Sequence, residues 1–225
     1  MSPDPRVPGW NFKRIQDKYH NLSAGIFLVS LLFVITLPRW YSWMIFFLAG
    51  LIFGLVVYFF RDPNRSITYQ EGICYSPADG KVSDIDQLKE YDQEWVRVGI
   101  FMSVLDVHVQ RAPLRGRVDF INHQAGKHLP AYHPQASFEN DRISMGLLTK
   151  AGLIITKQIA GILARTCVNY AEEGKEIQTG QRFGLIKFGS RVELYLPPSV
   201  DLLVAVGDQV RGGLTPIAEI VRENN

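Results

Sequence analysis

Ser190, His108 and Asp79 are the residues of this chain whose types and settings best suit covalent or proton-transfer chemistry. Ser190 follows Gly189, and the pair interrupts a segment that otherwise has the apolar pattern of a β-strand. Because glycine has no Cβ, a side chain can come close to the Gly189 carbonyl, and the nearest is the Ser190 hydroxyl. Histidine, with an ordinary pKa of about 6.5, can exchange protons near neutral pH.

Each of these residues also has an ordinary structural explanation. A glycine inside a strand usually marks a bulge or a close backbone contact. His108 lies between two valines in an alternating segment, so it faces away from them and could be a hydrogen-bonded strand histidine. Asp79 and Gly80 form a common turn pair. The residues taken singly therefore do not decide between these explanations and a catalytic site.

From Ile67 onward the chain consists of short alternating segments separated by turn residues, which is typical of β-strands. The predicted fold class is mainly β, with a sandwich- or barrel-like core. Residues 122–142 are polar and irregular, and we expect a long loop there over the active site. The predicted strands are Lys81–Ile85, Trp95–Met102, Leu105–Val109, Gly116–Ile121, Ser144–Leu148, Leu153–Ile159, Ile162–Tyr170, Val192–Leu196, Leu202–Val206 and Ile217–Val221.

The tail of the chain has a second recognisable pattern. Val204–Leu214 resembles the hairpins of biotinyl and lipoyl carrier domains, and Ala78–Val82 resembles them more faintly. Those carriers hold their cofactor on a lysine between two strands, and the tail has no lysine in that place. The resemblance therefore predicts the form of the hairpins and not a carrier function.

Two apolar runs, Leu22–Leu37 and Met44–Phe60, precede the β-rich part. Each is slightly shorter than the roughly 20 residues that cross a bilayer as a helix, but flanking aromatic residues extend it. Trp40, Tyr41 and Trp43, between the runs, are typical of a membrane interface. We therefore expect three parts: a polar segment, 1–21; a membrane-anchoring helical hairpin, 22–65; and a β-rich catalytic domain, 66–225.

Basic residues lie at both ends of this hairpin, while the connection between the runs holds only Arg39. Because basic residues remain on the cytoplasmic side, both ends are expected in the cytoplasm. One alternative is a signal peptide, which the second run and the lack of a small-residue cleavage site oppose. The other is a hairpin buried inside a soluble protein. The flanking basic residues are Arg6, Lys13, Arg14, Lys18, Arg61 and Arg65.

Composition excludes some classes of protein. The net charge of +2 gives no reason to expect a nucleic-acid partner. Cys74 and Cys167 have no metal-ligand spacing, which fits free thiols in a reduced, cytosol-facing domain. His123, His128 and His133 recur every five residues, a spacing that suits neither a helix face nor a strand face. We therefore expect no metal site there.

Four segments occur in the order, and with the residues, of one enzyme family. Together they resemble phosphatidylserine decarboxylase in its short prokaryotic form, from Ser76 to Ile220. Four motifs in register are far more specific than any one of them. The segments are Pro77-Ala-Asp-Gly80, Asp106-Val-His-Val-Gln-Arg-Ala-Pro113, Ala136-Ser-Phe-Glu-Asn-Asp-Arg142 and Phe188-Gly-Ser190.

This resemblance implies a proenzyme that cuts itself between Gly189 and Ser190 and turns Ser190 into a covalent pyruvoyl group, its cofactor. It implies phosphatidylserine in the membrane as the substrate, and a mature protein made of the two cleavage products, residues 1–189 and 190–225. The implied location is the inner membrane, with the catalytic domain on the cytoplasmic face. Whether the protein oligomerises further stays open.

The implied chemistry needs the residue types that are present. Attack of the Ser190 hydroxyl on the Gly189 carbonyl converts the peptide bond into an ester. Removal of the Ser190 Cα proton then expels the Gly189 carboxylate, and the remaining dehydroalanine tautomerises and is hydrolysed, which releases ammonia and leaves a ketone. That ketone would form a Schiff base with the substrate amine and accept the electrons left by departing CO₂. The expected product is phosphatidylethanolamine.

The resemblance also implies residue roles. His108 is the first choice for the acid–base group near Ser190, and Asp79 matches an aspartate that supports self-cleavage. Many members have a second histidine three residues after the first, where this chain has Arg111, which stays protonated and cannot act as a base. The base for self-cleavage therefore stays open between His108, serving both steps, and Asp79. Apart from the resemblance, the basic residues expected to contact the substrate headgroup are Arg111, Arg142 and Lys187, and solvated surface charge is the alternative for the last two.

Two functions of other classes remain open from the sequence. A non-catalytic membrane adaptor built on the carrier-like hairpins would not be cleaved and would not need Ser190. A membrane serine hydrolase using Ser190, His108 and Asp79 would react with a serine-directed phosphonate. Against the hydrolase, the chain lacks the Gly-x-Ser-x-Gly elbow around Ser190.

Overall fold

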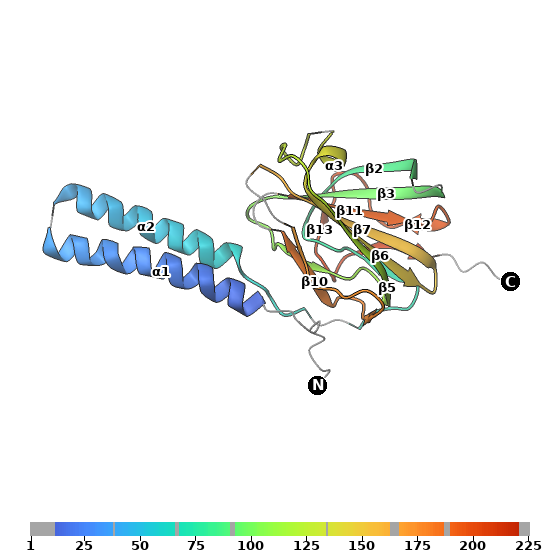
Figure 1. Ribbon diagram of the computed structural model, residues 1–225, viewed down its shortest axis with the longest axis horizontal. Coiled ribbons are helices and arrows are strands. Elements are labelled where there is room, and N and C mark those ends of the chain that lie inside the picture. The colour runs from blue at the N-terminus through green and yellow to red at the C-terminus, as the bar shows by residue number, and fades with distance from the viewer. Residues whose placement is uncertain are drawn as a thin grey trace. The chain divides into compact units, whose positions relative to one another are not determined.

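The computed structural model describes residues 12–37, 39–65, 68–90, 93–133, 135–162, 167–186 and 190–220. These residues belong to two compact units, a helical one within residues 10–63 and a β-rich one from Asn64 onward. Figure 1 shows the helices of the first unit and the curled sheet of the second.

The helical unit is a hairpin of α1 (Phe12–Thr36) and α2 (Trp40–Phe59). Both helices are free of proline and rich in residues that form helices in apolar surroundings. The two pack through aromatic contacts, and the ring centroid of Phe27 lies 4.9 Å from that of Phe46. Ser30 donates its hydroxyl hydrogen to the Phe27 carbonyl at 2.6 Å, so this polar side chain is satisfied within its own helix.

The helices begin earlier than the apolar runs that predicted them. In α2, Trp40, Tyr41 and Trp43 lie in the first turn and not in a separate connection. By length and composition, both helices could cross a membrane. Many of their apolar side chains are exposed, among them Val29 at 68% and Leu51 at 71%. Such exposure opposes the alternative of a hairpin buried inside a soluble protein.

The β-rich unit contains one large sheet and two small ones. Its strands are β1 (Ile73–Tyr75), β2 (Gly80–Glu90), β3 (Gln93–Met102), β4 (Val109–Arg111), β5 (Gly116–Gln124), β6 (Arg142–Thr149), β7 (Gly152–Ile159), β8 (Cys167–Asn169), β9 (Glu176–Ile177), β10 (Arg182–Ile186), β11 (Ser190–Leu196), β12 (Val200–Leu202), β13 (Gln209–Val210) and β14 (Pro216–Ile220). The large sheet has the order β13-β2-β3-β11-β7-β6-β5-β9, and the small sheets have the orders β1-β14-β12 and β4-β10-β8.

Strand β11 lies inside the large sheet, between β3 and β7, and all its residues are buried. Every second residue, Val192, Leu194 and Leu196, belongs to the main apolar core. The alternate residues, among them Glu193, lie on the opposite face of the sheet. The architecture confirms the predicted fold class, a mainly β core preceded by an apolar helical hairpin.

The strand predicted at Leu105–Val109 is wrong. Residues 103–108 form a turn and an irregular connection, and β4 begins only at Val109. The carboxylate of Asp106 accepts a hydrogen bond from the Ser103 backbone N–H at 2.8 Å, so a short polar side chain closes a turn. His108 therefore lies in a connection and not on one face of a strand.

Two other predicted strands are shorter than expected. The strand predicted at Leu202–Val206 ends at Leu202, because the Asp208 carboxylate accepts the Ala205 N–H at 2.8 Å and closes a turn. Of the strand expected at Ile162–Tyr170, the structure describes β8 but neither Ile162 nor Tyr170 as strand, and residues 163–166 lie outside the described part of the chain.

The polar segment 122–142, predicted as a loop, is partly regular. Strand β5 continues to Gln124, and α3 (Ala136–Glu139) forms one turn of helix. Asn140 fastens the remainder, since its Nδ2 donates to the carbonyls of Leu129 and Ala160, both at 2.8 Å. The segment is thereby tied to the residue that follows β7.

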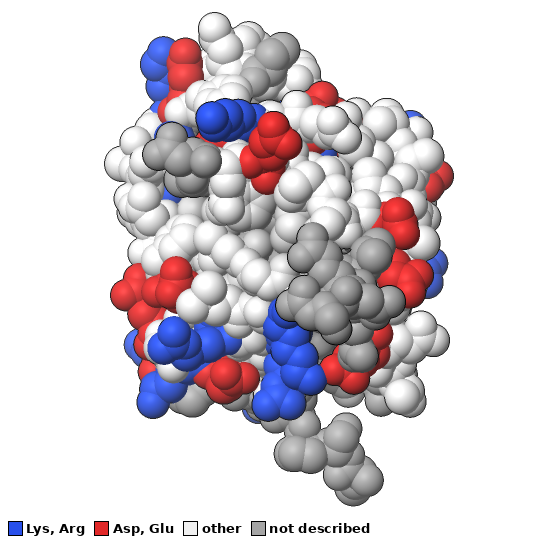
Figure 2. Space-filling model, turned by 90° about the vertical axis from the view of Figure 1, so that its right-hand side faces the viewer, with Lys and Arg blue, Asp and Glu red and all other residues white. Residues whose placement is uncertain are grey.

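Figure 2 shows one face of the molecule, on which acidic and basic side chains are interspersed around a largely uncharged area. Neither sign predominates there, in keeping with the net charge of +2.

Candidate active site

The beginning of β11 is the centre of the candidate site. Ser190 is the first residue of the strand, is fully buried, and lies opposite Met102 at the end of β3. The Ser190 hydroxyl lies 3.5 Å from the Met102 sulfur. Gly189, Phe188 and Lys187 lie outside the described residues, so the bond expected to be cut comes immediately before the described strand.

His108 is almost completely buried, with 1% of its surface exposed. Its Nδ1 lies 2.9 Å from the Asp106 carbonyl oxygen. A carbonyl oxygen can only accept, so Nδ1 holds the proton of the neutral ring and Nε2 is the basic nitrogen. The His108 carbonyl accepts the N–H of Ile186 at 3.3 Å. His108 therefore lies beside the strand that leads toward Ser190.

Buried residues that sequence reasoning did not single out connect His108 to Ser190. The Gln110 Nε2 donates to the His108 carbonyl at 2.8 Å and lies 3.9 Å from the Met102 sulfur, which also contacts Ser190. The Gln158 Nε2 donates to the Gln110 Oε1 at 3.0 Å. Both glutamines are fully buried. His108 and Ser190 are thus joined through one methionine–glutamine pair.

Asp79 makes a separate set of contacts at the same end of the sheet. Arg65 donates to both of its carboxylate oxygens, at 2.5 and 2.7 Å, and the Gly212 N–H donates to Oδ1 at 2.8 Å. Asp79 comes just before β2, and β3 separates β2 from β11. One strand, β3, therefore separates the strand that follows Asp79 from the strand that begins with Ser190.

Two of the three expected headgroup contacts lie in the described part of the chain. Arg111 is 3% exposed, and its Nη1 donates to a turn carbonyl at 3.1 Å. The Nη1 of Arg142 donates to the carbonyls of Phe138 and Asn140, at 2.5 and 3.1 Å, and so closes the end of α3. Lys187 lies outside the described residues.

The histidine series and the cysteines make no metal-binding group in the described ranges. His123 Nε2 lies 2.9 Å from the Asp141 carboxylate, and His133 Nδ1 accepts a backbone N–H at 3.2 Å. No cluster of three or more His, Cys, Asp and Glu side chains suited to a metal occurs among the described residues. Cys74 and Cys167 are buried thiols, and burial raises the pKa of Cys74 to about 12.

A broad cleft lies near the turn between β6 and β7, at the other end of the large sheet. Its lining includes Leu148, Lys150 and Glu71 and none of the proposed site residues. Ser190 is instead at the end where β3 and β7 finish, since the neighbouring Arg191 pairs with Ile159. Ser190 and His108 are both buried at this end of the sheet.

Comparison with known proteins identifies the class of enzyme. A family model described as phosphatidylserine decarboxylase matches residues 52–218. The chain therefore belongs to the phosphatidylserine decarboxylase family, and it is a carboxy-lyase. This membership excludes both alternatives, the non-catalytic adaptor and the serine hydrolase.

Three relatives are each named phosphatidylserine decarboxylase proenzyme. The protein of Parabacteroides distasonis is 34% identical over 217 residues, which cover 90% of this chain and 99% of the relative. That of Amoebophilus asiaticus is 39% identical over 78% of this chain and 80% of its own length. That of Carboxydothermus hydrogenoformans is 38% identical over 86% of this chain and 93% of its own length.

Proposed function

We propose that this chain is a membrane-anchored proenzyme that cleaves its own Gly189–Ser190 bond and then decarboxylates phosphatidylserine with the group formed from Ser190. The observation that supports this most is the position of Ser190, a fully buried serine at the start of an interior strand. The relatives are named proenzymes, which agrees with a chain that must be processed.

The surroundings of Ser190 fit a small buried ketone. Its hydroxyl contacts the Met102 thioether, and the Gln110 amide lies beyond it. Neither a thioether nor an amide would react with a ketone at neutral pH, so both leave it available to the substrate amine. A pyruvoyl group would supply that ketone and accept the electrons that departing CO₂ leaves. The burial of Ser190 would keep water away from the reacting atoms.

His108 is the proposed base for self-cleavage and the proposed acid–base group in decarboxylation. The hydrogen bond at its Nδ1 leaves Nε2 as the basic nitrogen, and Gln110 links its backbone to the methionine that touches Ser190. His108 would remove the Cα proton of residue 190 during self-cleavage and later return a proton to the substrate carbon that has lost CO₂.

Asp79 supports self-cleavage by holding the neighbouring chain in place. Both of its carboxylate oxygens already accept hydrogen bonds from Arg65, which favours His108 over Asp79 as the base. Through Arg65 and Gly212, Asp79 fastens the start of β2 to the tail of the chain. Arg111 remains a cation and binds a headgroup carboxylate or phosphate, together with Arg142 and Lys187.

The helical hairpin keeps the enzyme at the membrane that contains its substrate. Its two long apolar helices support membrane association. The basic residues at both ends, with Arg39 alone in the connection, support an orientation with both ends in the cytoplasm. The catalytic unit then acts on the cytoplasmic face of the inner membrane.

The direct test is conversion of phosphatidylserine to phosphatidylethanolamine by purified protein in lipid vesicles. The wild type is expected to be active and sensitive to hydroxylamine, whereas Ser190→Ala remains one chain and is inactive. Ser199→Ala, at an exposed turn serine, is the matched control and keeps its activity. An active Ser190→Ala protein would contradict the proposal.

A further inference from the structure

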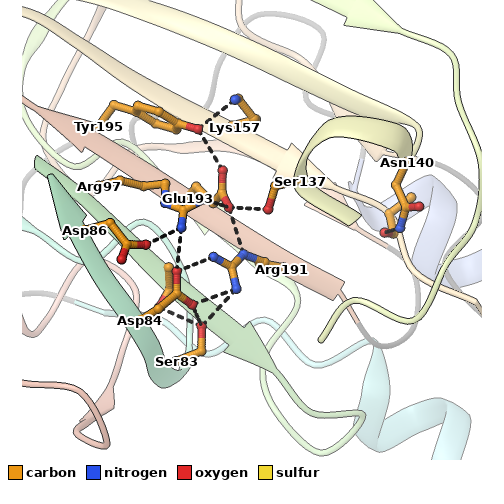
Figure 3. Close-up of polar contacts among 12 residues, drawn as sticks. Ser83, Asp84, Asp86, Arg97, Ser137, Asn140, Lys157, Arg191, Glu193 and Tyr195 are labelled. Atoms are coloured by element: carbon orange, nitrogen blue, oxygen red, sulfur yellow. Dashed lines mark hydrogen bonds and ion pairs between the residues drawn. The ribbon is translucent and has the colours of Figure 1, made fainter. Parts of the chain in front are cut away.

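The face of the large sheet opposite the apolar core contains a network of charged side chains that the proposed chemistry does not use (Figure 3). Arg191, the residue after Ser190, is one of its members. The Nη1 and Nη2 of Arg191 donate to the two carboxylate oxygens of Asp84 at 2.7 and 2.6 Å. Its Nε donates to the Glu193 Oε1 at 2.9 Å. The guanidinium of Arg191 is therefore held by two carboxylates.

Glu193 extends this network across the sheet. Its carboxylate, which is fully buried, accepts hydrogen bonds from Ser137 at 2.6 Å and from Arg97 at 3.2 Å. The Tyr195 hydroxyl donates to the other carboxylate oxygen at 2.9 Å and accepts from Lys157 at 2.7 Å. Figure 3 shows these side chains meeting on one face of the sheet, below the turn of α3.

The network joins the two segments that self-cleavage would separate. Arg191, Glu193 and Tyr195 belong to residues 190–225, the smaller product. Their partners Asp84, Ser137, Arg97 and Lys157 all precede the cut, on β2, α3, β3 and β7. The contact nearest to the cut is the two-pronged one between Arg191 and Asp84.

Cleavage changes position 190 from a residue within a chain into a chain end. The peptide bond that held it is lost, and the converted residue no longer has the backbone N–H of a strand residue. Chain ends move unless something ties them down. We propose that Arg191 and Asp84 are positioning residues that hold the new end of the smaller product, and the reactive group on it, opposite Met102. This inference rests on the proposed function.

The sequence makes room for this ion pair. Gly99, in the middle of β3, lies opposite Glu193 in one neighbouring strand and Asp84 in the other. A Cβ on Gly99 would come within 2.7 Å of the Asp84 Oδ2 and would also meet the Arg191 guanidinium. Glycine at position 99 therefore leaves the space in which the Arg191–Asp84 ion pair crosses β3.

The pair also stays ionised. Burial alone would raise the pKa of Asp84, but hydrogen bonds from Arg191 and Ser83 and the charges of Arg191 and Arg97 bring that pKa below its usual value. General stability is a weak explanation for such a pair, because apolar residues of the same shape often stabilise a fold equally well. A fixed two-pronged geometry beside the cut explains it better.

The test introduces Arg191→Met and Asp84→Asn into two backgrounds, the wild type and the uncleaved Ser190→Ala protein. Intact mass first establishes cleavage, and urea titration then measures stability. Each variant is expected to lower the urea midpoint more in the cleaved background than in the uncleaved one. It is also expected to lower kcat by about 10- to 100-fold with little change in KM, since the reactive group is displaced.

Arg191→Lys keeps the charge without the two-pronged contact and should recover only part of kcat. The near-isosteric Asp84→Asn decides the test where Arg191→Met fails to fold or to cleave. The matched control is Lys150→Met, which breaks an exposed 2.7 Å ion pair with Glu71. It should leave kcat unchanged and should shift the urea midpoint in neither background. If Arg191→Met and Asp84→Asn shift the urea midpoint equally in the cleaved and uncleaved backgrounds and leave kcat unchanged, the positioning role is overturned while the proposed function stands. A wild-type chain that stays uncleaved overturns the proposed function as well.

Discussion

The residues proposed to react, Ser190 and His108, are contacted by buried side chains to which no chemistry is assigned but which hold them in position. The Asp106 carbonyl orients the His108 ring, and Gln110 holds the backbone of His108 while lying against Met102. Met102 in turn contacts the Ser190 hydroxyl. Gln110 and Met102 therefore form the contacts that join the proposed base, His108, to the proposed nucleophile, Ser190.

Replacing Gln110 by leucine should loosen His108 and slow self-cleavage. The change removes the hydrogen bond to the His108 carbonyl and deprives Gln158 of an acceptor, at a cost of about 1–3 kcal/mol. Urea titration of the uncleaved Ser190→Ala protein measures the stability change, and the time course of cleavage in freshly synthesised protein measures the rate. Gln87→Leu, at an exposed position of β2, is the control and should cleave normally. Cleavage by Gln110→Leu at the wild-type rate would contradict this account of His108.

Ser190, His108 and Asp79 were predicted as site residues because each lies in a short motif, and the motifs follow one another along the chain in the order of one family. Gln110 and Gln158 could not be found in the same way, since the hydrogen bond between them joins residues 48 positions apart. The only signal was a polar residue inside an apolar strand segment, which needs a buried partner. Arg65 was interpreted as a membrane-flanking charge, and its partner Asp79 became visible only in the folded chain.

Among the elements, β11 both begins with Ser190 and packs against the rest of the β-rich unit on its two faces. One of its faces lies in the apolar core, and the other bears the charged network in which Arg191 and Glu193 take part. It pairs with β3 along its whole length and with β7 from Arg191 to Tyr195. A strand held on two edges and two faces can keep its first residue in place when the preceding bond is cut.

The charged network predicts that the protein loses stability in acid. The pKa of Asp84 is lower in the folded protein than its ordinary value of 3.8, so its ion pair contributes fully above that value and is lost as the pH falls through the folded pKa. The difference in urea midpoint between wild type and Asp84→Asn should therefore be largest near neutral pH and shrink below about pH 4. A midpoint difference that stays constant down to pH 3 would contradict a role for the ionised pair. The control is Glu71→Gln, which changes an exposed carboxylate and should show no comparable midpoint difference.

Most strands could be predicted from alternation, because half-buried strands show it directly. The error at Leu105–Val109 arose because Val107, His108 and Val109 are all buried, so apolar residues there mark burial and not a strand face. The error at Leu202–Val206 has another cause: Leu203 and Val206 are exposed, and a turn closed by Asp208 follows β12. The network around Glu193 could not be predicted, since β11 alternates apolar residues with charges that a solvent-facing strand would equally show.

At the scale of the whole molecule, the segment after the proposed cut is divided among sheets of the β-rich unit. It contributes β11 and β13 to the large sheet and β12 and β14 to a small sheet with β1. Its apolar residues, among them Val210 and Ile217, belong to the same core as Val98 from β3. The two products should therefore remain associated under native conditions and separate only on denaturation.

The helical hairpin predicts a fixed orientation in the membrane. Arg39→Cys, in the connection between the helices, should react with a membrane-impermeant maleimide in intact spheroplasts, whereas Lys150→Cys should react only after lysis. Cys74 and Cys167 should contribute little, because both are buried and burial raises the pKa of each thiol. Labelling of Lys150→Cys in intact spheroplasts would show the opposite orientation.

Ser190 is proposed to be both the site of self-cleavage and the source of the reactive group, and intact mass spectrometry of the denatured wild-type protein can decide this. Two products are expected: residues 1–189, and a fragment from position 190 to 225 that is lighter, by the mass of one ammonia, than simple hydrolysis would produce. A single mass for the whole chain, or a small fragment that still begins with an unmodified serine, would contradict it.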